Sequence, residues 1–147
     1  MHFEFIEKDG LFFYYLSMFK KFNPNPNGAY VGDCVIRALV KILKEDWHHA
    51  YLDVCIQGYV LCDMPSANHV WGSFLQKKGF TRTIIPNSCP DCYTVRDFCA
   101  DHPQGEYILA TGSHVIAVVD GDYFDAWDSG EEVPIYYWQK GEQNGVE

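Results

Sequence analysis

The sequence predicts an α+β domain in which helices come first and an antiparallel β-sheet follows. Residues 34–78 carry three helical patterns of apolar side chains, whereas residues 105–138 resemble a series of short strands. The chain has 147 residues, the length of one ordinary domain. We therefore expect a single domain over residues 1–147, with its core in residues 23–138.

Two apolar runs begin the chain. Residues 3–7 and 11–19 flank Lys8-Asp9-Gly10, and this pattern predicts a hairpin or an N-terminal extension over residues 1–22. The Asn and Pro residues that alternate over residues 23–28 are typical of a loop. The more strongly patterned part of the chain starts after this loop.

Helices and strands are then expected in two blocks. Three helices, one strand, a turn and a short helix are predicted at residues 34–45, 46–60, 66–78, 80–85, 86–91 and 94–101. Four strands are predicted at residues 105–111, 114–119, 123–127 and 133–138. Helices that precede an antiparallel sheet define the α+β class.

Composition and charge exclude several kinds of protein. A chain that is 48% hydrophobic and 21% charged, with 16% aromatic residues, is not disordered, collagenous or a coiled coil. The net charge of −9 argues against a nucleic-acid partner or an anionic membrane surface. No basic region precedes residues 11–19, which are too few to span a bilayer. We therefore expect a cytoplasmic protein with reduced thiols and no membrane partner.

Cys34 follows a helix-start signal. Gly32 and Asp33 precede the first helix, and aspartate is a good N-cap residue. Advancing 100° per residue places Cys34 on the narrow polar side of the helix with Arg37 and Lys41, while the apolar side chains cover the wide side. The positive end of a helix lowers the pKa of a thiol, so this position suits a nucleophilic thiolate as well as it suits a small apolar filler.

A predicted hairpin brings a histidine and an aspartate together. With a three-residue loop over residues 120–122, His114 lies directly opposite Asp128, and Asp125 points to the other face. An aspartate beside a histidine fixes its tautomer and stabilises its imidazolium, as the third member of a catalytic triad does. The alternative is a structural hydrogen bond between the two side chains. A two-residue turn would instead place residue 127 or 129 opposite His114.

Three short motifs follow one another in the chain, namely Gly32-Asp33-Cys34, Gly112-Ser113-His114-Val115 and Trp127-Asp128-Ser129. In this order the sequence resembles the papain-like superfamily of cysteine peptidases. It is most similar to the small bacterial and phage members, including the domains that cleave bacteriocin leaders after double glycine. The resemblance covers about residues 23–138. It implies a cysteine-bearing helix packed against an antiparallel sheet that carries the histidine and an Asn or Asp.

The resemblance also implies roles for individual residues. By position, Cys34 would be the nucleophile, His114 the base and Asp128 the residue that orients the histidine, with a peptide or protein substrate and no cofactor. The family usually carries a glutamine six residues before the cysteine, where this sequence has Gly28. The nearest amide side chains, Asn27 and Asn25, are therefore the candidate donors to the oxyanion.

Other functions use the same residues. An amidase, an isopeptidase or an acyl transferase would have the same triad, because a fold does not fix the substrate. From a different class, a catalytically inactive papain-like domain would bind peptides or another protein. The sequence therefore predicts a thiol hydrolase and keeps these two alternatives.

A second group of cysteines has the spacing of a half zinc site. Cys89 and Cys92 form a C-x₂-C pair, which Cys99 with His102, or alternatively Cys55 with Cys62, would complete as four zinc ligands. No second C-x₂-C pair exists in the chain. Reduced and partly buried thiols are the preferred interpretation, and we expect no bound metal.

Overall fold

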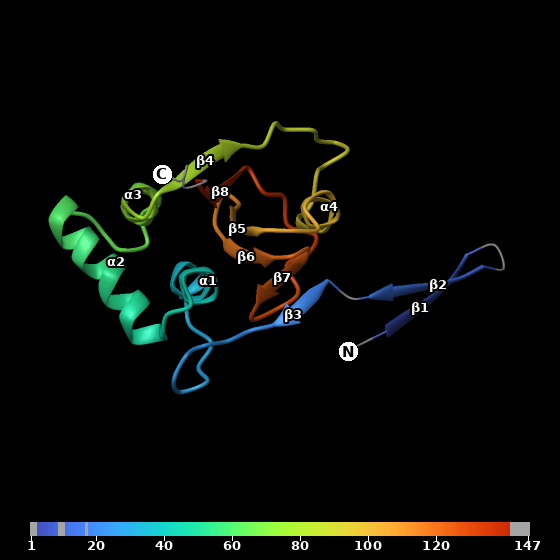
Figure 1. Ribbon diagram of the computed structural model, residues 1–147, viewed down its shortest axis with the longest axis horizontal. Helices are drawn as coiled ribbons and strands as arrows, with labels where there is room; N and C mark the ends of the chain where they lie inside the picture. Colours follow the sequence, from blue (N-terminus) through green and yellow to red (C-terminus); the bar gives the residue numbers. More distant parts are fainter. Residues whose placement is uncertain (1–2, 9–10, 17, 142–147) are drawn as a thin grey trace, which may run out of the picture.

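The computed structural model describes residues 3–8, 11–16 and 18–141, with side chains described from residue 18 to residue 141. Within this part, the chain is an α+β structure with four helices and a six-stranded mixed sheet (Figure 1). The strands are β1 Phe3–Lys8, β2 Leu11–Leu16, β3 Phe19–Lys21, β4 Phe80–Ile84, β5 Glu106–Ala110, β6 Val115–Val119, β7 Asp122–Asp125 and β8 Tyr136–Lys140. The helices are α1 Cys34–Leu43, α2 Trp47–Leu61, α3 Asn68–Lys77 and α4 Val95–Asp101. The α+β class predicted from the sequence is confirmed.

The six-stranded sheet has the order β3-β7-β6-β5-β8-β4. Strands β4 to β8 pair antiparallel, as expected, but β3 pairs parallel to β7. The sheet is therefore mixed, which corrects the expectation of a purely antiparallel one. Strands β1 and β2 pair antiparallel with each other in a separate two-stranded sheet, and the residues between them lie outside the described part.

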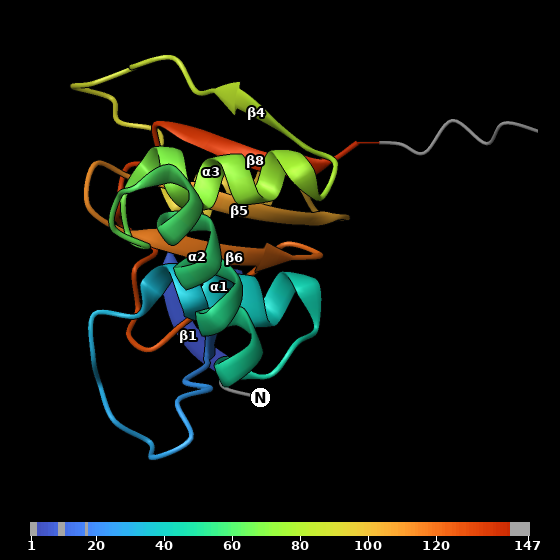
Figure 2. The same ribbon diagram turned by 90° about the vertical axis from the view of Figure 1, so that its left-hand side faces the viewer.

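Two apolar cores lie on the two faces of the six-stranded sheet. Helices α1, α2 and α3 cover one face and α4 covers the other (Figures 1 and 2). Successive strand residues point to opposite faces, so Ile108 enters the first core and Leu109 the second. Because both faces are covered, β5 and β6 are almost continuous apolar runs rather than alternating ones.

None of the described helices combines the length and the apolar composition that crossing a bilayer requires.

Candidate active site

Cys34 is the first residue of α1 and is half-buried. Asp33 stands at the N-cap position, but its side chain does not cap the helix. Its Oδ1 instead accepts a hydrogen bond from Arg37 Nη1 at 2.7 Å, and its Oδ2 accepts one from Trp47 Nε1 at 2.9 Å. The expectation that Asp33 caps α1 is therefore wrong, since its carboxylate faces into the protein and binds a guanidinium.

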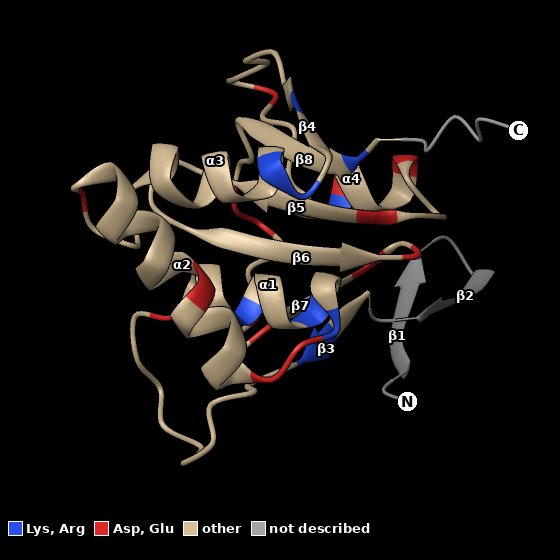
Figure 3. Cartoon of the chain, turned by 60° about the vertical axis from the view of Figure 1, so that its left-hand side comes forward, with Lys and Arg blue, Asp and Glu red and all other residues tan. Residues whose placement is uncertain are grey.

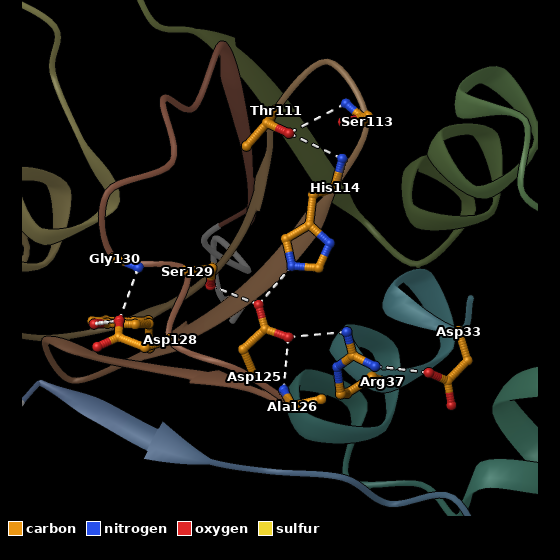
Figure 4. Close-up of polar contacts among 11 residues, drawn as sticks. Asp33, Arg37, Thr111, Ser113, His114, Asp125, Ala126, Asp128, Ser129 and Gly130 are labelled. Atoms are coloured by element: carbon orange, nitrogen blue, oxygen red, sulfur yellow. Dashed lines mark hydrogen bonds and ion pairs between the residues drawn. The ribbon is translucent and has the colours of Figure 1, made fainter. Parts of the chain in front are cut away.

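His114 directly precedes β6, and its backbone is held on both sides by Thr111. The Thr111 hydroxyl accepts a hydrogen bond from the His114 amide at 2.9 Å, and the Thr111 amide donates to the His114 carbonyl at 2.8 Å. The imidazole Nε2 lies 2.6 Å from Oδ2 of Asp125, the last residue of β7 (Figure 4). Backbone and side chain of His114 are thus both fixed.

The carboxylate of Asp125 is completely buried and fully hydrogen-bonded. Oδ1 accepts from Arg37 Nη2 at 2.9 Å and from the Ala126 amide at 2.7 Å. Oδ2 accepts from Ser129 Oγ at 2.6 Å, in addition to His114. Burial alone would raise the pKa of Asp125, but the hydrogen bonds from His114 and Ser129 and the charge of Arg37 lower it. Asp125 therefore remains a carboxylate in a fixed orientation.

Asp128 is not the partner of His114, which corrects the pairing expected from the sequence. The hairpin has a two-residue turn, because Val119 pairs with Asp122. Continuing this register places Trp127 opposite His114, and their rings stack with centroids 5.0 Å apart. A shift of one residue exchanges the two faces of a strand, so Asp125 comes to the His114 side, diagonal to it across the ladder.

Asp128 belongs to a different cluster of side chains. Its carboxylate binds Arg96 Nη2 at 2.9 Å, accepts a hydrogen bond from the Tyr123 hydroxyl and accepts another from the Gly130 amide at 3.1 Å. It lies apart from His114 in Figure 4. These contacts hold the end of the hairpin against α4, so Asp128 has a structural role.

Cys34 and His114 favour the charged form of each other. Burial raises the pKa of the Cys34 thiol, but hydrogen bonds from His114 and the Val115 amide, with the positive charge of Arg37, lower it below its ordinary value. Burial lowers the pKa of His114, but Asp125 and Cys34 outweigh this and raise it to about 9. Because Nε2 faces Asp125, Nδ1 is the ring nitrogen left for the sulfur. Both shifts favour a thiolate and an imidazolium over the neutral thiol and imidazole.

A cavity of about 770 Å³ opens beside this pair, a size typical of ligand sites. Its lining includes Cys34, His114, Val31, Tyr51 and Trp127. Tyr51 and Trp127 are each about half exposed, at 46% and 48%. Cys34 and His114 therefore face a cavity with largely apolar and aromatic walls.

Comparison with known proteins found no relative of this chain. No family model, no curated protein and no solved structure matches this chain significantly. Its function is therefore inferred from the arrangement of Cys34, His114 and Asp125.

The loop before α1 does not bring an amide side chain to the cavity. Asn25 Oδ1 accepts hydrogen bonds from the amides of Asn27 at 2.9 Å and Ala29 at 3.3 Å, which stabilises the loop itself. Neither Asn25 nor Asn27 is among the described residues that line the cavity, so the structure does not support them as oxyanion donors. The donors that remain are the backbone amide of Cys34, because the first amides of a helix have no partner within the helix, and the side-chain amide of Asn68, the first residue of α3, which lines the cavity.

The zinc candidates are not brought together. Cys89 and Cys92 form a disulfide, so the expectation that all thiols are reduced is wrong for this pair. Burial raises the pKa of Cys99 in α4 to about 12, and His102 Nδ1 donates to the Phe98 carbonyl at 2.9 Å. In the part that the structure describes, the one group of possible ligands close enough to share an ion is Glu45, His49 and Asp53.

Two features of the site were not predicted from the sequence, each for a different reason. The Asp120-Gly121 pair was a usable signal, because an Asp-Gly pair between two strands is typical of a two-residue turn with positive φ at both positions. The structure has this turn, with φ of 49° and 79°. No local signal marks Arg37 as buried, because its partner Asp125 is 88 residues away.

Proposed function

We propose that the protein is a thiol hydrolase, most specifically a papain-like cysteine peptidase. Cys34 is the nucleophile, His114 the general acid and base, and Asp125, in place of Asp128, the residue that orients His114. The observation that carries the proposal is the contact of these three side chains beside one cavity, with Cys34 favoured as thiolate.

The arrangement supports acyl transfer through a thioester. The Cys34 sulfur attacks the carbonyl carbon of the substrate, and His114 protonates the departing amine as the C–N bond breaks. His114 then removes a proton from water, which attacks the thioester and releases the acid and the Cys34 thiolate. Asp125 keeps the ring in place throughout, because its carboxylate also accepts hydrogen bonds from Arg37 and Ala126 at Oδ1 and from Ser129 at Oδ2.

The placement of the residues favours a papain-like architecture. The cysteine begins a buried helix that packs on the sheet, the histidine directly precedes β6, and its aspartate ends the neighbouring strand β7. An open cavity with apolar and aromatic walls suits a peptide chain. An amidase, an isopeptidase or an acyl transferase would use the same three residues, so these reactions are the enzymatic alternatives.

One observation favours a second candidate, an inactive domain that binds peptides. The loop before α1 places no side-chain amide at the cavity among the described residues. Loss of an oxyanion donor typically reduces the rate by about a hundredfold or more. An active hydrolase and an inactive binding domain would differ in turnover but not in the ionisation state of Cys34.

The deciding experiment combines thiol labelling with turnover. With one equivalent of iodoacetamide near neutral pH, we expect Cys34 to react before the exposed thiol of Cys62, its control within the same chain. We also expect the wild type to cleave peptides in a diverse mixture, with mass spectrometry as the readout. Cys34→Ala should lose this cleavage.

Each alternative outcome has a definite meaning. Preferential labelling of Cys34 without cleavage of peptides or simple amides would favour the binding domain. Equal labelling of Cys34 and Cys62 would contradict the thiolate and the hydrolase together.

A further inference from the structure

Helix α2 is apolar on two opposite sides. One side carries Ala50 and Val54, which are buried in the core shared with α1 and α3. The opposite side carries four apolar side chains that remain in solvent, Leu52 at 58%, Ile56 at 60%, Tyr59 at 86% and Val60 at 59% exposure. The spacing of these four residues, at i, i+4, i+7 and i+8, is that of one helix face. We call this face the outer stripe of α2.

The outer stripe is poor in charge. Asp53 is the one Asp, Glu, Lys or Arg residue in α2, although the whole chain has a net charge of −9. Figure 3 shows α2 with little colour for charge along its length, and in Figure 1 it lies at the outside of the molecule. Contiguous exposed apolar residues of this kind typically mark a protein–protein interface. A second copy can approach here without bringing many carboxylates together.

We propose that the outer stripe is the interface of a homodimer, in which the α2 helices of two copies pack antiparallel about a twofold axis at Ile56. A twofold axis requires a surface that is complementary to itself. In this register Ile56 meets Ile56 of the second copy, and Leu52 meets Val60 of the second copy. All three positions are apolar, so the stripe satisfies this condition.

The charges at the two ends of the stripe fit the same register. In this register His49 of one copy lies beside the C-terminal end of α2 of the other copy, which Asp63 follows after the left-handed Cys62, and the twofold axis repeats this arrangement at the opposite end. Both side chains are accessible, with His49 61% and Asp63 41% exposed, and within one chain His49 lies 3.8 Å from Asp53 and Asp63 lies 3.1 Å from His69. An imidazole opposite a carboxylate favours the antiparallel arrangement over a parallel one, which would place identical groups together.

The size of the contact predicts a reversible dimer. Helix α2 has 15 residues and is therefore about 22 Å long. Two such helices in contact along their length bury on the order of 1,000 Å² in total, at the low end of specific interfaces. We therefore expect association in the micromolar range. Cys34 stays accessible, because the cavity borders a different side of α2, that of Trp47 and Tyr51.

Sedimentation of the full chain over a range of concentrations tests the dimer. We expect the wild type to pass from monomer to dimer with rising concentration. Ile56→Glu or Tyr59→Glu would bury a charge in the interface and raise the dissociation constant by at least about tenfold. The matched control is Ile84→Glu on β4, because Ile84 is an equally exposed isoleucine, at 69%, on another surface. It should leave the dissociation constant unchanged.

The charge at position 49 tests the register. His49→Lys should tighten the dimer and His49→Glu should weaken it, each by about two- to threefold. Circular dichroism shows whether each variant keeps its fold, so loss of the dimer is not confused with unfolding.

Three results would overturn the proposal. The first is a wild type that stays monomeric at all concentrations, which is also the result expected if the stripe binds an apolar segment of a substrate. The second is a dimer that persists in folded Ile56→Glu and Tyr59→Glu. The third is a dimer that Ile84→Glu disrupts. None of these depends on hydrolase activity, so the dimer and the proposed function fail separately.

Discussion

At the scale of single residues, the candidate active site is a chain of groups with alternating charge. Asp33, Arg37, Asp125 and His114 follow one another as ion pairs, and the chain ends at Cys34, whose thiolate form the neighbouring positive groups favour. Taking such groups out of water is costly, and burying them is favourable only when each has a partner in good geometry. The two bonds of Arg37, at 2.7 and 2.9 Å, meet this condition. The hydrogen bond from Arg37 thus helps to hold the Asp125 carboxylate in contact with His114 Nε2.

Replacing each of the two hairpin aspartates with asparagine tests which of them orients His114. Asp125→Asn should lower kcat by up to about 10⁴-fold, because His114 loses the carboxylate that orients it and stabilises its charge. Asp128→Asn should leave kcat within a few-fold, since its partners are Arg96 and Tyr123. Both variants are measured on one substrate. A larger loss for Asp128→Asn would contradict the assignment of Asp125.

The charge of Arg37 gives a prediction that needs no substrate. Arg37 lowers the pKa of Cys34, so Arg37→Met should move the midpoint of a pH profile of Cys34 alkylation to higher pH. It should also reduce stability by about 3–5 kcal/mol, because two buried carboxylates lose their partner. Arg37→Lys retains the charge and should shift the midpoint less.

A matched control for Arg37 lies one turn further along α1. Lys41 is near the Phe124 ring, at 3.9 Å from its centroid, and Lys41→Met should leave the alkylation profile unchanged. Identical profiles for wild type and folded Arg37→Met would show that Arg37 has no part in activating Cys34.

At the scale of elements, the β6–β7 turn decides which aspartate reaches His114. Asp120 and Gly121 both have positive φ, and glycine adopts this conformation without strain. A Cβ added at Gly121 would lie 3.3 Å from the Cys99 carbonyl oxygen and 3.3 Å from Pro103 Cα. The turn is thus restricted both by its own backbone and by the end of α4.

Substitution of Gly121 tests this restriction. Gly121→Ala should lower the free energy of unfolding by about 1–2 kcal/mol, because alanine is strained at positive φ and contacts backbone atoms of a neighbouring segment. Gly112→Ala is the control, since an added Cβ there meets nothing within 4 Å. Urea denaturation of both variants measures the difference, and equal losses would argue against strain at the turn.

The elements of this fold were more predictable than their pairing. Apolar periodicity is local, so the helices around α1 to α4 and the strands β4 to β8 were expected within a few residues of their observed bounds. The order of Cys34 and His114 along the chain indicated the site. The identity of the aspartate depended on a single residue of loop length, and the burial of Arg37 depended on a contact between distant segments.

At the scale of the whole molecule, the reactive pair joins two layers of the fold. Cys34 begins α1, one of the helices on one face of the sheet, and His114 directly precedes β6 of the sheet itself. Unfolding separates them, so their charges contribute to stability in a way that depends on pH. His114, whose folded pKa is raised to about 9, stabilises the fold at low pH and loses this contribution as pH rises through that value. Cys34, whose folded pKa is lowered, behaves in the opposite way and stabilises the fold at high pH.

These opposite effects predict how Cys34→Ala changes the pH dependence of stability. Near neutral pH a folded thiolate–imidazolium pair holds one proton, on His114, and the unfolded pair also holds one, on Cys34, so such a pair gives the wild type almost no slope. Cys34→Ala leaves a folded state that keeps the His114 proton and an unfolded state that has lost it. The free energy of unfolding of Cys34→Ala should therefore fall, relative to wild type, by at most about 1.4 kcal/mol between about pH 7 and 8. The decrease is smaller to the extent that removal of Cys34 lowers the pKa of His114 in the folded state. Urea denaturation at several pH values measures it, with Cys62→Ala as the control that should behave as wild type. Parallel curves for wild type and Cys34→Ala would show that the folded protein does not hold a thiolate–imidazolium pair.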